Sequence, residues 1–125
     1  MIAVIFEVTP LPGQEERYFE SAALLRAHLD KMDGFMSVER FQSLSRPGCY
    51  LSLSFWRDED AVRAWRNHHQ HRAEQVEGRE AVFADYRIRV AEVRRDYTLA
   101  QRQQAPGDSN TVLQALLPIG SHPPA

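Results

Sequence analysis

A tryptophan and three histidines fall within seven residues of this chain, at Trp65, His68, His69 and His71. Histidine is the side chain whose unperturbed pKa lies nearest to neutrality, so it commonly accepts and donates protons at physiological pH. On a helix, Trp65, His68 and His71 recur at three-residue steps and can share one face, with His69 at its border. We predict that His68 or His71 is a general base that removes a phenolic proton from a ring stacked on Trp65. The plainer interpretation is an exposed helix end with solvated histidines, and a tryptophan that belongs to the core or an interface.

A metal site is the other chemistry that clustered histidines suggest, and it needs at least three convergent ligands. The run HHQH has no supporting cysteine or carboxylate at evident metal-ligand spacing, although Glu74 lies three residues after His71. We therefore expect no native metal site. The sequence also contains no glycine-rich phosphate loop, nucleophile elbow or zinc motif.

Composition restricts the remaining possibilities. The chain has 125 residues, of which 15 are basic and 17 acidic, giving a net charge of -2. This balance argues against a dedicated nucleic-acid or anionic-membrane binder. Cys49 is the single cysteine and cannot form an internal disulfide, and the apolar start MIAVIFEVTP is too short for a signal peptide or membrane span. We expect a cytoplasmic protein.

Hydrophobic periodicity predicts six elements followed by a tail. A short run of β-branched and aromatic residues indicates the first strand, and turn residues at Arg46-Pro47-Gly48 favour a hairpin between the second and third strands. Asp58 is a good N-cap for the second helix. A change in the apolar pattern indicates a bulge or a change of covered face near Val90. The predicted elements are a strand at 2–8, a helix at 14–32, strands at 35–43 and 50–56, a helix at 59–76, and a strand within 83–97.

This order predicts an α+β protein with a ferredoxin-like βαββαβ arrangement, in which both helices cover one face of an antiparallel sheet. We assign residues 1–98 to this domain and residues 99–125 to a tail that is flexible or packs on a partner subunit. The other sheet face carries apolar side chains that the chain itself does not cover. A homodimer that packs sheet against sheet would cover them.

Four segments carry a resemblance to a known family: IFEV, DGFMSVERFQS, YLSLSFWRDEDAVRAWRNHHQHR and FADYRIRVAEVRRDY. Together they resemble the antibiotic biosynthesis monooxygenase superfamily over about residues 1 to 98. The resemblance implies a dimeric α+β barrel with a pocket between the sheet and the two helices of each protomer. We expect Trp65, Phe55, Phe83 and Tyr86 to bind the substrate there, although these aromatic residues are most simply core and dimer interface.

The superfamily is functionally mixed, because a shared fold does not carry a shared reaction. Trp65 matches the helix tryptophan of its heme-degrading branch, but the position of that branch's iron-ligating histidine is Gln75 here. The asparagine expected near Phe6 and Glu7 is also absent. The leading hypothesis is therefore a cofactor-independent monooxygenase of a small aromatic or quinol-like molecule. A heme-binding or heme-degrading protein with a displaced histidine, and a non-enzymatic ligand-binding dimer, stay open as alternatives.

Overall fold

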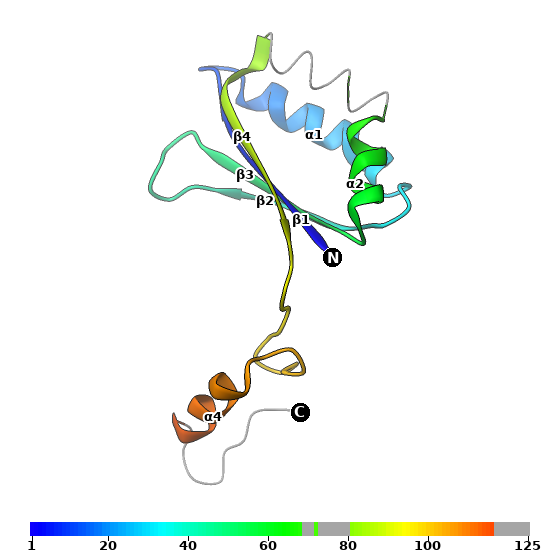
Figure 1. The fold of residues 1–125 in the computed structure, drawn as a ribbon. Helices are drawn as coiled ribbons and strands as arrows, with labels where there is room; N and C mark the ends of the chain where they lie inside the picture. The colour runs from blue at the N-terminus through cyan, green and yellow to red at the C-terminus, as the bar shows by residue number, and fades with distance from the viewer. Residues whose placement is uncertain (69–71, 73–80, 117–125) are drawn as a thin grey trace. The chain divides into compact units, whose positions relative to one another are not determined.

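The computed structural model describes residues 1–68, 72 and 81–116 (Figure 1). The chain divides into two compact units, Met1–Glu92 and Val93–Ala125. The first unit contains six elements in the predicted order. They are β1 (Ile2–Pro10), α1 (Glu15–Leu29), β2 (Phe35–Gln42), β3 (Tyr50–Trp56), α2 (Glu59–Arg66) and β4 (Phe83–Glu92).

The four strands form one sheet in the order β2-β3-β1-β4, and every neighbouring pair is antiparallel. This order places β1 and β3 in the centre and β2 and β4 at the edges. It confirms the predicted ferredoxin-like α+β fold.

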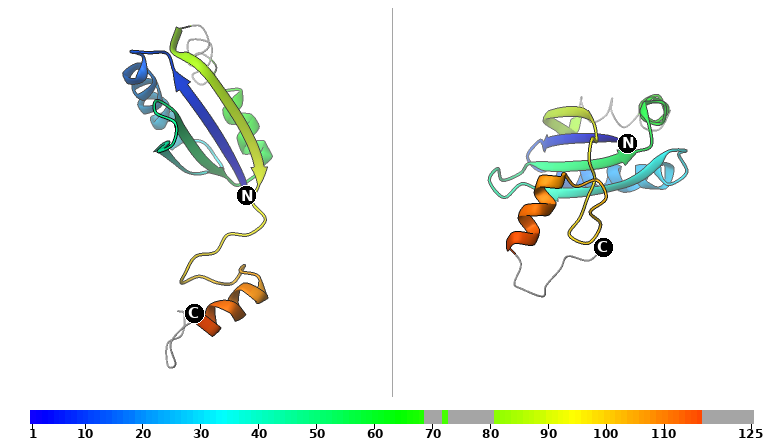
Figure 2. Two further views of the ribbon diagram at one scale, coloured as in Figure 1. Left: turned by 90° about the vertical axis from the view of Figure 1, so that its left-hand side faces the viewer. Right: turned by 60° about the horizontal axis from the view of Figure 1, so that its bottom comes forward.

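Strand alternation divides the residues of the sheet between two faces. On β1, Ile2 and Val8 are buried toward the helices, since they join core clusters that contain residues of α2 and α1 respectively. Ala3, Ile5, Glu7 and Thr9 alternate with this set and therefore point to the other face. Both helices lie on one side of the sheet (Figure 2). We call that side the helix-facing side and the other the open face, because no helix of the described part of Met1–Glu92 lies against it.

The helix-facing side contains two hydrophobic clusters at opposite ends of β1. The first cluster draws on β1, β3 and both helices, and Trp56 at its centre is 1% exposed. Its buried members are Ile2, Leu29, Trp56, Ala61, Val62 and Trp65. The second cluster contains buried Val8, Tyr18 and Val82, with aromatic residues packed around them. Leu24 of α1, in contrast, is 58% exposed.

Helix α2 begins as its sequence predicts and ends earlier. The side chain of Asp58 accepts a hydrogen bond from the Ala61 N–H at 2.9 Å, which confirms the N-cap. The helix ends at Arg66, with Asn67 as its C-cap, so the prediction of one continuous helix over 59–76 is wrong at this point. Asparagine has a low helix propensity, in keeping with the end of the helix here. Residues 69–71 and 73–80 lie outside the described part of the chain.

The predicted irregularity in β4 is present at a different position. The pairing of β1 with β4 is regular from Ile2↔Glu92 through Thr9↔Asp85, including Val4↔Val90. The register shifts only between Thr9 and Pro10, because Pro10 pairs with Phe83. The expectation of a bulge near Val90 is therefore wrong. Val90 and Ala91 simply point to opposite faces, as regular alternation requires.

The unit Val93–Ala125 contains helix α4 (Gly107–Leu116). Upstream of this helix, the Arg102 guanidinium lies over the Tyr97 ring and donates a hydrogen bond to the Asn110 side chain at 3.0 Å. The sequence predicted a linker and a tail here and did not identify the helix. No helix in the described residues is long and apolar enough to cross a membrane.

Candidate functional site

Trp65 and His68 form the core of the candidate site at the end of α2. Their rings are stacked, with centroids 5.4 Å apart and planes inclined by 27°. Trp65 in turn stacks on Trp56 of β3, at 6.3 Å and 29°. The predicted three-residue spacing therefore brings the tryptophan and one histidine together, and buried Trp56 of β3 fixes their position.

A second histidine reaches this site from α1. The His28 and His68 rings have centroids 5.2 Å apart, so a histidine of α1 meets the histidine that follows the end of α2, beside Trp65. The sequence analysis missed His28. The sequence feature that could have identified His28 is its position three residues after Leu25 and next to Leu29, on the border of the apolar stripe of α1.

The Nδ1 atom of His68 is buried and has no hydrogen-bond partner among the described residues. A buried polar atom that lacks a partner costs about 1–3 kcal/mol relative to a bonded one. Such atoms are uncommon in native proteins and point to a strained or functional position. This nitrogen is therefore the strongest indication of chemistry in the described part of the chain.

The second aromatic group lies at the other end of the helix-facing side. Phe6, Phe83 and Tyr86 surround one another, with three centroid distances between 5.9 and 6.1 Å. Tyr18 of α1 packs edge-on against Phe83 at 5.9 Å. Burial raises the pKa of the Tyr18 hydroxyl, and the nearby Arg40 guanidinium partly opposes this effect.

An apolar strip of β4 connects the two ends. Tyr86, Ile88 and Val90 pair with Val8, Phe6 and Val4 of β1, so all three lie on the helix-facing side. They are nevertheless 40%, 44% and 48% exposed. Val4 packs against the cluster that contains Trp65, and Phe6 packs in the second cluster. The β4 strip is thus an uncovered apolar wall between the histidine pair and the aromatic group.

The structure does not bring all the predicted site residues together. Phe55 neighbours Trp56 on β3 and pairs with Ala3, so it lies on the open face and not between the sheet and the helices. Phe83 and Tyr86 lie on the helix-facing side, in the second aromatic group. His71 lies outside the described residues, as do His69 and Gln75.

Two cofactor questions concern the same residues. In the described part of the chain, no three histidine, cysteine, aspartate or glutamate side chains lie close enough together to hold a metal ion.

The heme hypothesis depends on a displaced histidine, and His68 is the described candidate. Its ring is stacked on Trp65 and close to His28, and its Nδ1 is buried. The heme alternative therefore stays a prediction for this histidine.

Sequence comparison identifies relatives of the domain. The family model described as "Antibiotic biosynthesis monooxygenase" matches residues 1–76. A protein of Pyricularia oryzae called "Jasmonate monooxygenase ABM" is 48% identical over 93 residues, which cover 74% of this chain and 43% of that protein. The chain therefore spans less than half the length of this relative. The uncharacterized protein YqjZ of Bacillus subtilis is 32% identical over 78 residues, covering 62% of this chain and 67% of that protein.

Solved structures share the fold at lower identity. A Mycobacterium tuberculosis protein superposes with a TM-score of 0.70 at 15% identity, covering 78% of this chain and 98% of that one. A putative antibiotic biosynthesis monooxygenase from Deinococcus radiodurans gives a TM-score of 0.67 at 15% identity, covering 78% and 97%. The sequence match spans β1 to α2, including the stacked Trp65 and His68, and the structural matches support the same architecture. The chain belongs to the antibiotic biosynthesis monooxygenase family.

Proposed function

We propose that this protein is a monooxygenase of a small quinol-like aromatic molecule, which binds on the helix-facing side between the β4 strip and the Trp65–His68 pair. The observation that carries the proposal is the buried Nδ1 of His68, which has no partner in the described residues and lies in a ring stacked on Trp65. Membership of the family supports the reaction class.

Trp65 supplies an edge rather than an open ring face to a planar substrate, because it is 9% exposed and stacks on both Trp56 and His68. An aromatic ring pair is worth about 0.5–1.5 kcal/mol beyond the burial of its area. Because Trp65 is held by Trp56, the indole is fixed before the substrate binds. The β4 strip supplies apolar contact for the rest of the ring system, and Tyr86 can form a further edge-on contact.

His68 supplies the proton acceptor. A substrate hydroxyl placed at Nδ1 would give this nitrogen the hydrogen-bond partner that it lacks, and would transfer its proton there. The resulting phenolate is electron-rich and reacts with O2 at a ring carbon. His71 was also predicted as a base and stays a prediction.

The electron balance explains why such a substrate needs no further reductant. A hydroquinone and O2 give a hydroxyquinone and water, with one oxygen atom in each product. The ring loses four electrons in total and O2 gains four. One C–H bond and two O–H bonds are broken, one C–O bond forms, and the hydroxyquinone keeps one exchangeable hydroxyl.

The experiment compares His68→Asn and His71→Asn in oxygen uptake with a panel of hydroquinones and naphthols. We expect His68→Asn to lower kcat by about 100-fold or more, the usual contribution of a positioned base. His28→Asn is the matched control, because it removes a neighbouring imidazole but leaves Nδ1 of His68 in place. Uptake by His68→Asn at the wild-type rate, with its fold intact by circular dichroism, would contradict the assignment of the base.

The Pyricularia relative favours a second substrate class. Its name specifies jasmonate, and the two proteins are 48% identical over the matched region. Insertion of one oxygen atom of O2 into a saturated C–H bond consumes two electrons from an external reductant, such as a reduced nicotinamide, and releases water. Jasmonate turnover that depends on added reduced nicotinamide would therefore favour this class, whereas quinol turnover without a reductant would favour the first.

We also propose a homodimer formed through the open face. The centre of this face is apolar on two adjacent strands, where Ile5 pairs with Leu53 and Ala3 pairs with Phe55. Phe41 on β2 adds an aromatic side chain that is 42% exposed. Contiguous apolar surface of this kind marks an interaction site. Leu53→Lys should convert the dimer to a monomer, and sedimentation equilibrium measures this change. A Leu53→Lys protein that sediments as wild type would contradict the proposal.

A further inference from the structure

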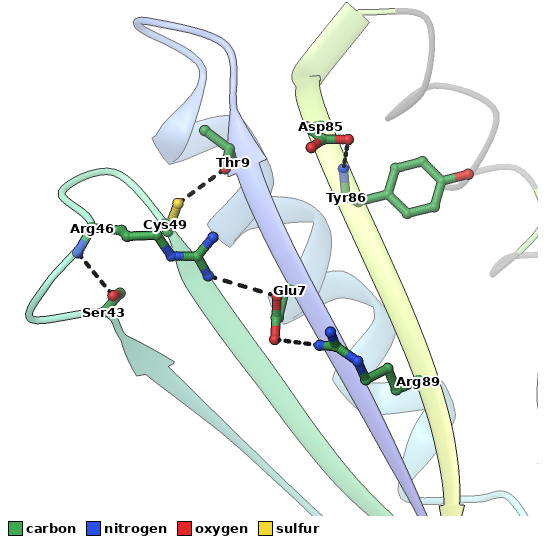
Figure 3. A network of polar contacts seen from close by, with 8 residues as sticks. All are labelled: Glu7, Thr9, Ser43, Arg46, Cys49, Asp85, Tyr86 and Arg89. Atoms are coloured by element: carbon green, nitrogen blue, oxygen red, sulfur yellow. Dashed lines mark hydrogen bonds and ion pairs between the residues drawn. The ribbon is translucent and has the colours of Figure 1, made fainter.

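The open face carries a depression of about 380 Å³ at the end of the sheet next to the hairpin between β2 and β3 (Figure 3). Its polar lining comes from β1, β4 and the hairpin: Glu7, Thr9, Arg46, Cys49, Asp85 and Arg87. Glu7 pairs with Arg87 and Thr9 pairs with Asp85 across β1 and β4, which sets these side chains on one face. The side chains of Glu7, Thr9, Asp85 and Arg87 therefore point away from the side that carries Trp65 and His68, and Val8 and Tyr86 between them complete the lining. Its volume lies within the range of small-molecule sites.

Glu7 is already neutralised within this group. Arg89 donates to its Oε1 at 2.9 Å, and Arg46 forms an ion pair with its Oε2 at 3.6 Å. Figure 3 shows the two guanidinium groups approaching the carboxylate from opposite sides. Each carboxylate oxygen of Glu7 thereby already has one arginine beside it.

Arg87 is a third arginine of this group. It stands opposite Glu7 in the sheet register, yet it has no hydrogen-bond or ion-pair partner among the described residues. Arg46 has only the 3.6 Å ion pair for its guanidinium in the same part of the chain. Three arginines therefore face two carboxylates, Glu7 and Asp85, which leaves a positive charge without a partner and two guanidinium groups with free donors.

The remaining groups of the depression are polar and mixed in type. The Thr9 hydroxyl and the Cys49 thiol form a hydrogen bond at 3.1 Å, in which either can be the donor. One Asp85 oxygen accepts the Tyr86 backbone N–H at 2.9 Å, and its other oxygen has no partner in the described residues. A ligand hydroxyl can donate to that second oxygen.

We propose that this depression binds a small hydroxycarboxylate. The ligand carboxylate lies between Arg46 and Arg87, and its hydroxyl donates to Asp85. Guanidinium groups match carboxylates in planar geometry and bind them with charge-assisted hydrogen bonds. Because the sheet separates this site from His68, the inference does not rest on the proposed reaction. The site binds an additional small molecule, not the substrate of the oxygenase.

The test is a titration of the full chain with glycolate and with malate, with glycolamide as the neutral control. The first readout is the set of backbone amide shifts of Thr9, Cys49 and Arg87 in nitrogen-15 NMR spectra. The second is the rate at which iodoacetamide alkylates Cys49, the single cysteine of the chain. Glycolate or malate should shift these amides saturably and slow alkylation over the same concentration range. Glycolamide should do neither, and higher salt should weaken binding.

Two substitutions should move the affinity in opposite directions. Arg87→Gln removes a charged donor and should weaken binding about tenfold. Glu7→Gln releases Arg46 and Arg89 from their shared carboxylate and should strengthen binding about threefold. Arg66→Gln removes an exposed arginine from the last turn of α2 and should leave the affinity unchanged.

Several results would overturn the inference. Equal shifts with glycolamide would show that charge is not recognised. Equal weakening by Arg66→Gln and Arg87→Gln would show a response to net charge alone. A change in dimer dissociation by Arg87→Gln, without saturable glycolate or malate binding, would assign these arginines to a contact with a second copy instead.

Discussion

The two faces of the central sheet differ in how completely a single protomer covers their side chains. On β3, Trp56 is 1% exposed beneath α2, whereas Phe55 beside it is only partly buried on the open face. The helix-facing side combines two closed clusters with an uncovered apolar strip on β4. The open face combines an apolar centre with a charged end around Glu7. The neighbouring residues of β3 therefore serve different purposes: Trp56 packs in the core, and Phe55 lies on the face that we propose for dimer contact.

The sharpest test of this difference is to replace Trp56 and Phe55 by alanine, one in each variant. Trp56→Ala should lower the free energy of unfolding by about 3–5 kcal/mol, because it leaves a cavity at the centre of the first cluster. Phe55→Ala should cost about 1 kcal/mol in a dilute monomer, because its side chain is partly exposed there. Urea unfolding at two protein concentrations measures both effects.

The concentration dependence distinguishes the faces. The cost of Phe55→Ala should increase with protein concentration if a second copy covers the open face, since association stabilises the folded form by mass action. The loss of stability caused by Trp56→Ala should not increase with protein concentration in this way. Equal costs for the two variants at every concentration would remove the distinction between the faces.

Two glycines with positive φ differ in how much space surrounds them. Gly34 has φ +85° on the helix-facing side, and a Cβ there would lie 2.6 Å from the Cβ of Ala61 in the first cluster. Gly48 has φ +80° in the hairpin, and a Cβ there would meet nothing within 4 Å.

Gly34→Ala should therefore cost about 2–4 kcal/mol, from backbone strain together with overpacking. Gly48→Ala should cost about 1–2 kcal/mol, from backbone strain alone. Thermal unfolding followed by circular dichroism compares the two variants. An equal loss in both would mean that α2 moves away from Gly34 without cost.

The smallest expected effect concerns the acid stability of the helix-facing side. The hydrogen bond from the Ala61 backbone N–H, with a smaller effect of Arg57, holds the pKa of Asp58 below its usual value of 3.8. The hydrogen bond from Arg57 also lowers the pKa of Asp33. A carboxyl group with a lowered pKa in the folded state stabilises the protein above its unfolded-state pKa. This stabilisation is lost as the pH falls through the folded-state pKa.

Wild-type protein should therefore lose stability below about pH 4 more steeply than Asp58→Asn does. Urea midpoints measured from neutral pH down to about pH 2 give the two slopes. Parallel curves would show that this cap does not contribute to the pH dependence.

The sequence predicted those features that depend on local pattern. The order of strands and helices was predicted correctly, and the acidic residue before α2 correctly identified Asp58 as the cap. The three-residue step from Trp65 to His68 predicted that they lie on one side, and their rings do lie together, although His68 follows the end of α2. Each of these depends on neighbours a few residues away along one element.

Features that depend on tertiary packing were missed. His28 meets His68 only because α1 and α2 pack side by side, and Arg46 and Arg89 meet at Glu7 only once the hairpin and β4 flank β1. The change in the apolar pattern near Val90 indicated either a bulge or a change of covered face. The pairing with β1 shows ordinary alternation instead, with the shift at Pro10.

The most direct test of the central claim is a turnover under oxygen-18 gas with a hydroquinone that the wild-type protein oxidises. The His68→Asn protein serves as the background for uncatalysed oxidation. We predict that mass spectrometry finds one labelled oxygen atom per hydroxyquinone, with the second atom in water, and that His68→Asn forms about 100-fold less labelled product. Product oxygen that derives from solvent water, or equal labelled product from both proteins, would contradict a monooxygenase that uses His68.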